Sequence, residues 1–380
     1  MSIDPQSPLE LVFLQATPFC NINCDYCYLP GRGDKARMSF ETLHRVLEFV
    51  RDLGSKNGSY CLVWHVGEPL VVPIDWYREA HQLCTELLGE SLEFHFQTNG
   101  TLLSQEWIAL LKNDPRIRIC VSLDGPAQLH DAHRKTRGGG PTHVRVMGGV
   151  ALLRDAGVPF DCIAVVTESS LNFPDEFYQF FVDTGPRMLS INAENVDGAN
   201  LATSLAGKHH EVRYRRFLRR IADLHLREKR FAIRDFIWPQ LRLQDFAEKR
   251  DNRPPLSGNR INQAWRILSV DWMGRIHTFS PSLLGMEIPG VGKWLGDVRV
   301  DTPRAIVSSE RVARLQTEID VGVDKCRQEC RLFEHCGGGS PAHKYFEHGS
   351  FATSETSQCR LGVQANWEEY LAAAEELAFQ

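Results

Sequence analysis

The stretch that decides the fold is PFCNINCDYCYLP, residues 18–30, which places Cys20, Cys24 and Cys27 within eight residues. Structural zinc takes four protein ligands, and an odd number of thiols does not pair completely into disulfides. A four-iron cluster held by three thiolates instead leaves one iron open for another ligand. The spacing therefore favours an iron–sulfur cluster with an open iron over a structural zinc site.

The composition is that of an ordinary globular chain. Hydrophobic residues make up 43% and charged residues 24% of the 380 residues, and the formal net charge is −5. This charge gives no reason to expect nucleic acid or a membrane surface as a partner. The N-terminal sequence has no basic segment followed by an apolar one, and no run reaches the roughly 18 apolar residues of a membrane span. We therefore expect a cytoplasmic protein, in which clustered cysteines bind metal or catalyse.

Six short apolar runs in the first 200 residues alternate with helical patterns. This alternation predicts a parallel sheet covered by helices, and thus an α/β fold. Six strand–helix units are too few for a closed eight-stranded barrel, so we predict a partial (β/α)6 barrel of the TIM type. The runs cover residues 9–15, 59–66, 92–98, 117–123, 160–167 and 187–192.

Polar or glycine-rich clusters follow most of these predicted strands. Because the carboxyl ends of parallel strands meet at one edge of a sheet, these clusters predict a single site there. The pattern changes after about residue 205, where a basic helix leads into a Pro-rich stretch, residues 252–260. We therefore predict two domains, residues 1–235 and 236–380. The clusters are CNINCDYC (20–27), VGEP (66–69), QTNG (97–100), SLDGP (122–126) and INAENVDG (191–198).

A second set of cysteines lies near the end of the chain and consists of Cys326, Cys330, Cys336 and Cys359. Four thiolates suit either zinc or an iron–sulfur cluster, and their spacing alone does not decide between the two. The four isolated cysteines between the two sets are interpreted as small buried apolar residues, namely Cys61, Cys84, Cys120 and Cys162.

The motif CNINCDYCY resembles the signature of the radical S-adenosylmethionine (SAM) superfamily. The resemblance implies that Cys20, Cys24 and Cys27 hold a [4Fe-4S] cluster whose open iron binds SAM. WHVGEP (64–69) is similar to the GGEP element of that family, with Val66 in place of the first glycine. By the same resemblance, Gly67 and Glu68 receive the SAM amino group. Further implied SAM contacts are Gln97, Asn99, Ser122 and Arg134, with Ser122 and Arg134 at the ribose and carboxylate; Asp124 either caps its loop or touches substrate.

Beside such a core, the second cysteine set resembles the SPASM or twitch-like auxiliary domain of peptide-modifying enzymes. That resemblance implies one auxiliary [4Fe-4S] cluster on Cys326, Cys330, Cys336 and Cys359. Full SPASM members hold a further cluster, but Phe279 and Ser340 replace two of its expected cysteines. Related sulfatase-maturating enzymes carry an acid where this chain has Ser280, which argues against formylglycine formation.

The segments TFSPSLLG (278–285) and CGGGSPAHKYFEHGSFATSETSQCR (336–360) resemble the cyclophane-forming, GrrM/OscB-like branch of peptide maturases. This implies a carbon–carbon bond between an aromatic ring and the β-carbon of a nearby residue in a ribosomally made precursor peptide. It also implies a reducing partner of the flavodoxin or ferredoxin type, and it identifies no catalytic proton acceptor. The alternatives are another radical SAM reaction on a peptide, such as thioether formation or serine or cysteine oxidation, and a non-enzymatic metal-binding scaffold.

Overall fold

A computed structural model describes residues 9–54, 60–247 and 259–379. These residues contain one ten-stranded sheet with the order β12-β11-β10-β1-β3-β4-β5-β7-β8-β9. The pairs β10–β11 and β11–β12 are antiparallel, and all other neighbouring strands are parallel. Its strands are β1 (Leu11–Leu14), β3 (Tyr60–Trp64), β4 (Leu92–Thr98), β5 (Ile117–Ser122), β7 (Asp161–Val166), β8 (Met188–Ala193), β9 (Ala232–Ile233), β10 (Ile267–Val270), β11 (Arg275–Thr278) and β12 (Gly296–Asp297).

The six predicted strands are confirmed as β1, β3, β4, β5, β7 and β8. The predicted α/β class with a central parallel sheet is thereby confirmed. Residue 59 of the second run and residues 252–258 of the Pro-rich stretch lie outside the described residues.

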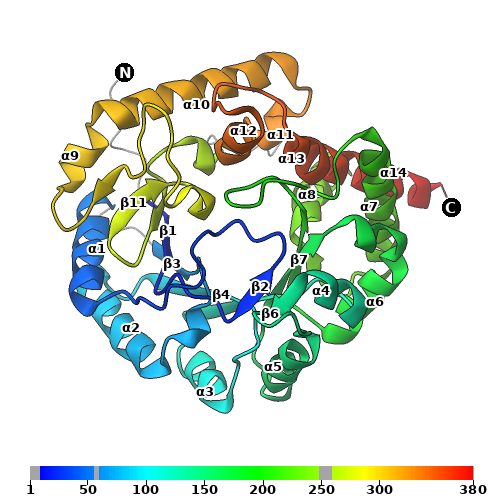
Figure 1. Cartoon of the computed structure of the whole chain (residues 1–380). Coiled ribbons are helices and arrows are strands. Elements are labelled where there is room, and N and C mark those ends of the chain that lie inside the picture. The colour runs from blue at the N-terminus through cyan, green and yellow to red at the C-terminus, as the bar shows by residue number, and fades with distance from the viewer. Residues whose placement is uncertain (1–8, 55–59, 248–258, 380) are drawn as a thin grey trace.

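Helices from the first 230 residues form an outer layer around the curved sheet (Figure 1). The first helix shows why these helices pack on the sheet. Its apolar residues recur at i, i+3, i+4 and i+7, so Leu43, Val46, Leu47 and Val50 are all buried on one face. Ser39 begins this helix by accepting a hydrogen bond from the Thr42 backbone N–H at 3.0 Å. The helices are α1 (Phe40–Leu53), α2 (Ile74–Leu88), α3 (Gln105–Asn113), α4 (Ala127–His133), α5 (His143–Asp155), α6 (Pro174–Thr184) and α7 (Lys208–Glu228).

Alternation along β4 separates the packed face of the sheet from its inner face. The Phe96 ring lies 4.9 Å from Tyr77 of α2 and 5.3 Å from Trp107 of α3, measured between ring centroids. Gln97 is next along the strand and therefore points to the opposite face, away from the helices. Side chains on that inner face are available for a site.

The sheet continues into the C-terminal part of the chain. β10 pairs in parallel with β1, in the register Leu11↔Ile267 to Leu14↔Val270. The division at residue 235 stays a prediction, and the sheet itself runs across it. The helices that follow β9 are α8 (Ile237–Ala247), α9 (Pro303–Val307), α10 (Glu310–Glu329), α11 (Phe333–Cys336), α12 (Pro341–His348), α13 (Ser357–Cys359) and α14 (Ala365–Ala378).

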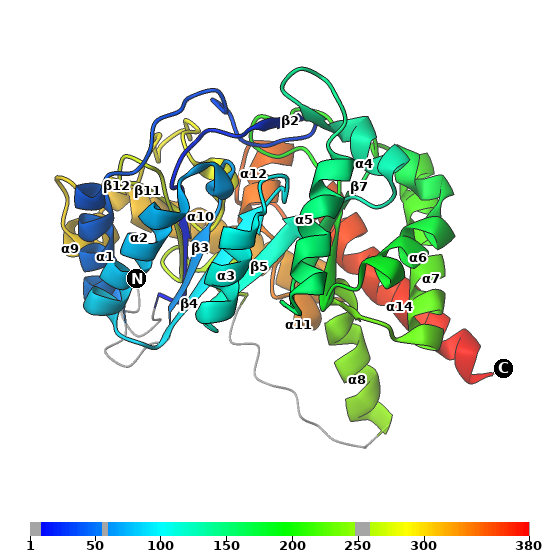
Figure 2. The same cartoon turned by 90° about the horizontal axis from the view of Figure 1, so that it is seen from below.

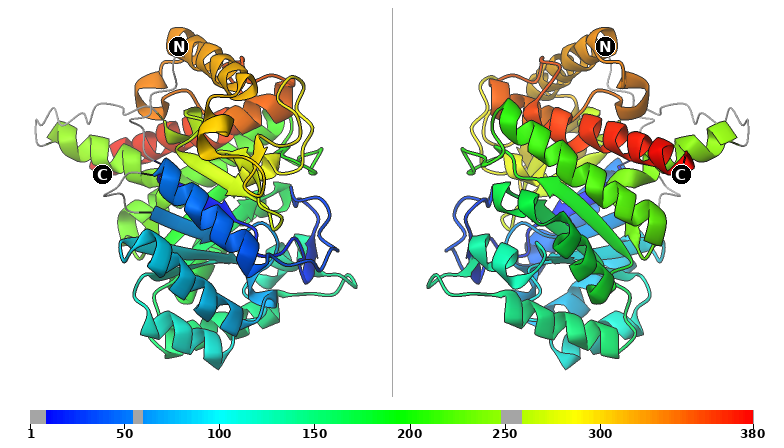
Figure 3. Two further views of the ribbon diagram at one scale, coloured as in Figure 1. Left: turned by 90° about the vertical axis from the view of Figure 1, so that its left-hand side faces the viewer. Right: turned by 90° about the vertical axis from the view of Figure 1, so that its right-hand side faces the viewer.

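The last helix, α14, packs along α7 (Figure 3). Arg215 of α7 contacts Glu368 at 2.6 Å, and Arg219 contacts Glu376 at 2.8 Å. Acidic side chains of α14 therefore oppose the charge of these two arginines of the basic helix. Within the described part of the chain, no helix is both long and apolar enough to cross a membrane.

Candidate functional site

The loop with the first three cysteines lies beyond the carboxyl ends of the strands, where Figure 2 shows its short strand β2. β2 (Ile22–Cys24) pairs antiparallel with β6 (Arg134–Thr136), so Cys24 lies opposite Arg134. The Arg137 side chain donates to the carbonyl oxygens of Cys20 and Arg32, each at 2.9 Å. Backbone pairing and one guanidinium thus fold the loop over the sheet edge.

The sulfur atoms of this loop face hydrogen-bond donors. Asn99 Nδ2 lies 3.8 Å from Cys20 Sγ, and a guanidinium nitrogen of Arg134 lies 3.9 Å from Cys24 Sγ. Burial raises the pKa of the Cys20 thiol to about 12 and that of Cys24 to about 11, so ionisation of these thiols requires a cation to compensate. All three cysteines are free thiols. Soft thiolate donors from one loop, flanked by N–H groups, fit an iron–sulfur cluster.

Gly67 and Glu68 lie directly beneath this loop, at the end of β3. Gly67 has φ +120°, and a Cβ there would lie 2.3 Å from the Thr17 carbonyl oxygen, so only glycine fits. The Glu68 carboxylate is buried and accepts hydrogen bonds from Thr98 Oγ1 at 2.6 Å and from the Asn99 and Leu70 backbone N–H groups at 2.7 and 2.8 Å. Burial raises the pKa of Glu68 to about 7, although these donors oppose the shift.

The predicted SAM contacts on the next two strands lie beside one another. Gln97 Nε2 donates to Ser122 Oγ at 3.0 Å, from the end of β4 to the end of β5. Asn99 Nδ2 donates to Asn21 Oδ1 at 2.8 Å, inside the cysteine loop. The strand-end clusters therefore converge as the sequence predicts, since parallel strands end at one edge.

Arg134 forms a buried ion pair with Asp124. The sequence analysis had left open whether Asp124 caps its loop or contacts substrate. The Arg134 guanidinium donates to both carboxylate oxygens, at 2.9 and 3.0 Å, while Tyr26 Oη and the Val165 backbone N–H donate to the same carboxylate. Burial opposes ionisation of Asp124, but the Arg134 guanidinium outweighs it and holds the pKa of Asp124 below its usual value. Asp124 thus ties the cysteine loop to β5.

The four C-terminal cysteines line one pocket of about 450 Å³. Cys326 lies in the last turn of α10, Cys330 is the C-cap residue of that helix, Cys336 ends α11 and Cys359 lies on α13. A water molecule occupies only about 30 Å³, so this pocket has room for more than a single ion. Among the described residues, no group of three His, Cys, Asp or Glu side chains is arranged to hold one metal ion. The four thiols and the size of this pocket fit a four-iron cluster.

Lys344 is a pocket residue that the sequence analysis did not identify. It is 1% exposed, and its Nζ lies 3.3 Å from Cys326 Sγ and donates to the Gly322 carbonyl at 3.0 Å. A buried ammonium group therefore lies beside one of the four thiols. No local pattern marks this lysine, because its partner lies 18 residues earlier on another helix.

The two residues in place of expected cysteines have structural neighbours of their own. Phe279 is buried and packs edge-on against Phe351, with ring centroids 6.3 Å apart. Ser340 precedes α12 as its N-cap residue. Among the isolated cysteines, Cys84 and Cys162 are buried as interpreted, but Cys61 and Cys120 are only partly buried. The interpretation was wrong for these two because they lie on the inner face of the sheet, away from the helices.

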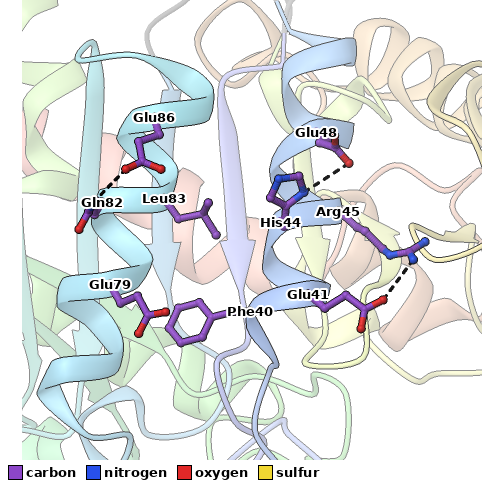
Figure 4. Close-up of a pocket in the computed structure, with 9 residues that line it drawn as sticks. All are labelled: Phe40, Glu41, His44, Arg45, Glu48, Glu79, Gln82, Leu83 and Glu86. Carbon is purple, nitrogen blue, oxygen red and sulfur yellow. Dashed lines mark hydrogen bonds and ion pairs between the residues drawn. The ribbon is translucent and has the colours of Figure 1, made fainter.

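A separate pocket of about 680 Å³ lies between α1 and α2 (Figure 4). It is lined by outward-facing side chains, among them the ion pairs Arg45–Glu41 at 3.1 Å and His44–Glu48 at 3.5 Å. None of the predicted site residues lines it, and it belongs to the outer helical layer.

Gly67→Ala should destabilise the protein more than an ordinary glycine replacement at positive φ. We expect a loss above about 2 kcal/mol in the free energy of unfolding, because strain at φ +120° adds to a backbone clash. Gly89→Ala is the matched control, since Gly89 has φ +88° and nothing within 4 Å of an added Cβ. Urea unfolding measures both variants, and equal losses would contradict the close approach at Gly67.

Three comparisons with known sequences relate this chain to other proteins. The radical SAM superfamily profile matches residues 14–181. An uncharacterised protein of Synechocystis sp. is 35% identical, over 97% of this chain and 93% of that protein. A serine-type anaerobic sulfatase-maturating enzyme of Bacteroides thetaiotaomicron is 32% identical, over 53% of this chain and 51% of the enzyme.

Solved structures with the same fold include proteins bound to AdoMet or to a precursor peptide. anSMEcpe with bound AdoMet superposes with a TM-score of 0.75 at 19% identity, over 98% of this chain and 94% of that one. SuiB of Streptococcus suis bound to its precursor peptide SuiA gives 0.64 at 17% identity, over 93% of this chain and 76% of that one. The superfamily profile, the whole-length relative and the sulfatase-maturating relative identify the chain as an enzyme that belongs to the radical SAM superfamily.

Proposed function

We propose that this enzyme is a peptide maturase that forms a cyclophane, a carbon–carbon crosslink between an aromatic side chain and a nearby β-carbon in a ribosomally made precursor peptide. The observation that carries the proposal is the presence of two thiol sets, three at the strand ends and four in a separate pocket. The likeness to anSMEcpe and SuiB, both solved with peptides, supports a peptide substrate. The strings 278–285 and 336–360 support the cyclophane branch.

Cys20, Cys24 and Cys27 would hold the SAM-binding [4Fe-4S] cluster, and Gly67 with Glu68 would receive the SAM amino group. Gln97, Asn99 and Ser122, whose side chains lie on the inner face or at the strand ends, would contact the rest of SAM. When bound, the cluster and SAM supply a 5′-deoxyadenosyl radical that removes a hydrogen atom from the peptide. A partner of the flavodoxin or ferredoxin type would supply the electron.

Arg134 has a double role in this proposal. Both of its hydrogen bonds to Asp124 hold the β2–β6 pair in place, and its remaining nitrogen faces Cys24 Sγ. A SAM carboxylate would therefore meet a guanidinium that is already oriented, which lowers the entropy cost of binding. We propose that Arg134 orients the cysteine loop first and contacts SAM through its remaining donor.

Cys326, Cys330, Cys336 and Cys359 would hold one auxiliary [4Fe-4S] cluster in a SPASM-like region, within the second of the two proposed domains. Four thiolates leave no open iron, so this cluster suits electron acceptance rather than substrate binding. The Lys344 ammonium and the Gly339 N–H, 3.2 Å from Cys336 Sγ, would stabilise the negative charge of the thiolates. Rearomatisation of the crosslinked ring releases the electron that this cluster would accept.

A second candidate is oxidation of a serine or cysteine in a sulfatase. The 32% identity to a sulfatase-maturating enzyme favours it, although the match spans only about half of each protein. Ser280 weighs against it, because its hydroxyl pairs with Ser282 at 2.7 Å and supplies no carboxylate.

The deciding experiment is product analysis. Anaerobically reconstituted enzyme, SAM, dithionite and a precursor peptide encoded beside the gene should give a product lighter by two hydrogens, since one bond forms and two C–H bonds break. Fragmentation should locate the link between an aromatic residue and a β-carbon. A thioether link, or conversion of a sulfatase peptide alone, would contradict the cyclophane proposal.

Cys336→Ala should separate SAM cleavage from crosslinking. The first thiol set is intact in this variant, so 5′-deoxyadenosine should still form, whereas crosslinked peptide should fall at least about tenfold for want of an electron acceptor. Cys61→Ala, an isolated strand thiol, is the matched control. Iron content should fall from about eight to about four per chain in Cys336→Ala only. A folded variant with normal crosslinking would remove the electron-acceptor role.

SAM binding should weaken below pH 7. Because burial raises the pKa of Glu68 to about 7, this carboxyl carries a proton at lower pH and must release it to pair with the positive SAM amino group. Affinity should be complete above pH 7 and fall about tenfold per pH unit below it. Equilibrium dialysis of the cluster-loaded protein between pH 5.5 and 8, with Glu68→Gln as the pH-independent reference, measures this. Constant affinity across that pH range would rule out Glu68 as the group that pairs with the SAM amino group.

A further inference from the structure

Carboxylates at the strand ends differ in how many hydrogen bonds they accept. Glu68 accepts three, and Asp124 accepts from Arg134, Tyr26 and a backbone N–H. Donors that fill the lone pairs of a carboxylate hinder it from accepting a proton. Asp197, in the loop after β8, is different. Its Oδ1 atom is shielded from solvent and accepts no hydrogen bond from any residue that the structure describes.

The Asp197 loop packs against the first cysteine loop. The Ala199 backbone N–H donates to the Tyr28 carbonyl at 2.7 Å, and a Cβ on Gly198 would lie 2.4 Å from that same oxygen. Tyr28 directly follows Cys27 in the sequence. Asp197 is therefore held on the side of the sheet where the first thiol set lies.

His343 belongs to α12, which lies beside the β8 loop (Figures 1 and 2). Its charge acts on Asp197, although no hydrogen bond or ion pair between these two side chains is found among the described contacts. His343 Nδ1 is also shielded from solvent and has no partner among the described residues. Burial raises the pKa of Asp197 and lowers that of His343, and the two groups oppose these shifts in each other. Glu347 of α12 raises the pKa of His343, and the Ser282 hydroxyl lowers that of Asp197. Burial thus moves the pKa values of the carboxylate and the imidazole toward each other, while their mutual attraction acts in the opposite direction.

α12 also reaches the second thiol set. Lys344, the residue after His343, lies 3.3 Å from Cys326 Sγ. Of these two consecutive residues of one short helix, Lys344 lines the C-terminal pocket, whereas His343 acts electrostatically on Asp197.

We propose that Asp197, assisted by His343, accepts the proton that oxidation of the peptide releases. This inference rests on the proposed function. The peptide loses two hydrogens in total: one leaves as an atom to the 5′-deoxyadenosyl radical, and the other leaves the ring carbon as a proton to Asp197 Oδ1. The accompanying electron goes to the iron–sulfur cluster of the second thiol set. His343 assists through its electrostatic action on Asp197, and its Nδ1 has no hydrogen-bond partner among the described residues.

Asp197→Asn tests the carboxylate with little change in shape. We expect 5′-deoxyadenosine to form as before, while crosslinked peptide per 5′-deoxyadenosine falls about 100-fold, in line with loss of a general base. His343→Gln should lower the same ratio by less. Asp183→Asn is the matched control, because Asp183 lies exposed on α6 and bonds only Gln179 among the contacts described. Iron content and the unfolding midpoint should match wild type in all three.

A second measurement needs no turnover. In protein with 15N-labelled histidine, the His343 signal, assigned by its loss in His343→Gln, should titrate at lower pH in Asp197→Asn, because Asp197 raises the pKa of His343. An unchanged titration, or an unchanged product ratio in either variant, would overturn the proposal. If Asp197→Asn loses iron, the ratio of crosslinked peptide to 5′-deoxyadenosine in His343→Gln tests the proposal instead. A wild-type enzyme that cleaves SAM but modifies no peptide would instead overturn the proposed function, and this inference with it.

Discussion

The buried ion pair between Arg134 and Asp124 is the interaction on which the rest of the site depends. Asp124 follows β5 of the rigid sheet, whereas Arg134 belongs to β6, which is attached to the cysteine loop through β2. The loop has only three residues of strand of its own, so it needs this anchor. Removing one partner of a buried pair leaves an uncompensated charge and costs about 3–5 kcal/mol. The positions of the first three thiols are therefore set by electrostatics as well as by backbone pairing.

The sheet could be predicted from local patterns because its strands and helices differ in period. Phe94 and Phe96 of β4 alternate with His95 and Gln97, and this period of two separates helix-facing from inward-facing residues. The extension of the sheet by β10 could not be predicted in the same way. Its four residues, ILSV, pair with β1 more than 250 residues earlier, and no local periodicity specifies a partner.

The candidate site also contains features that local sequence predicts and features that it does not. Strand-end clusters such as VGEP and QTNG meet because parallel strands share one edge, which the sequence predicts without knowledge of any contact. The pairs that give the site its electrostatics are different. Asp124 with Arg134, Asp197 with His343, and Lys344 with Cys326 each join residues from separate elements, and an aspartate or lysine in isolation carries no sign of its partner. The meeting of these clusters at the strand ends was thus predictable, whereas the protonation states of their side chains required the structure.

Three carboxylates at one sheet edge acquire different properties from their surroundings. Glu68 is buried without a cation and has a raised pKa, Asp124 faces a guanidinium and stays ionised, and Asp197 keeps one oxygen without a partner. Environments that differ in this way allow one residue type to bind, to anchor and to accept a proton in the same site. An electron that left such a water-poor site without a proton would leave an unpaired positive charge behind, which is costly at low dielectric. α12 carries both His343, which acts electrostatically on Asp197, and Lys344, which lies beside Cys326, so one helix links the proposed proton acceptor to the proposed electron acceptor.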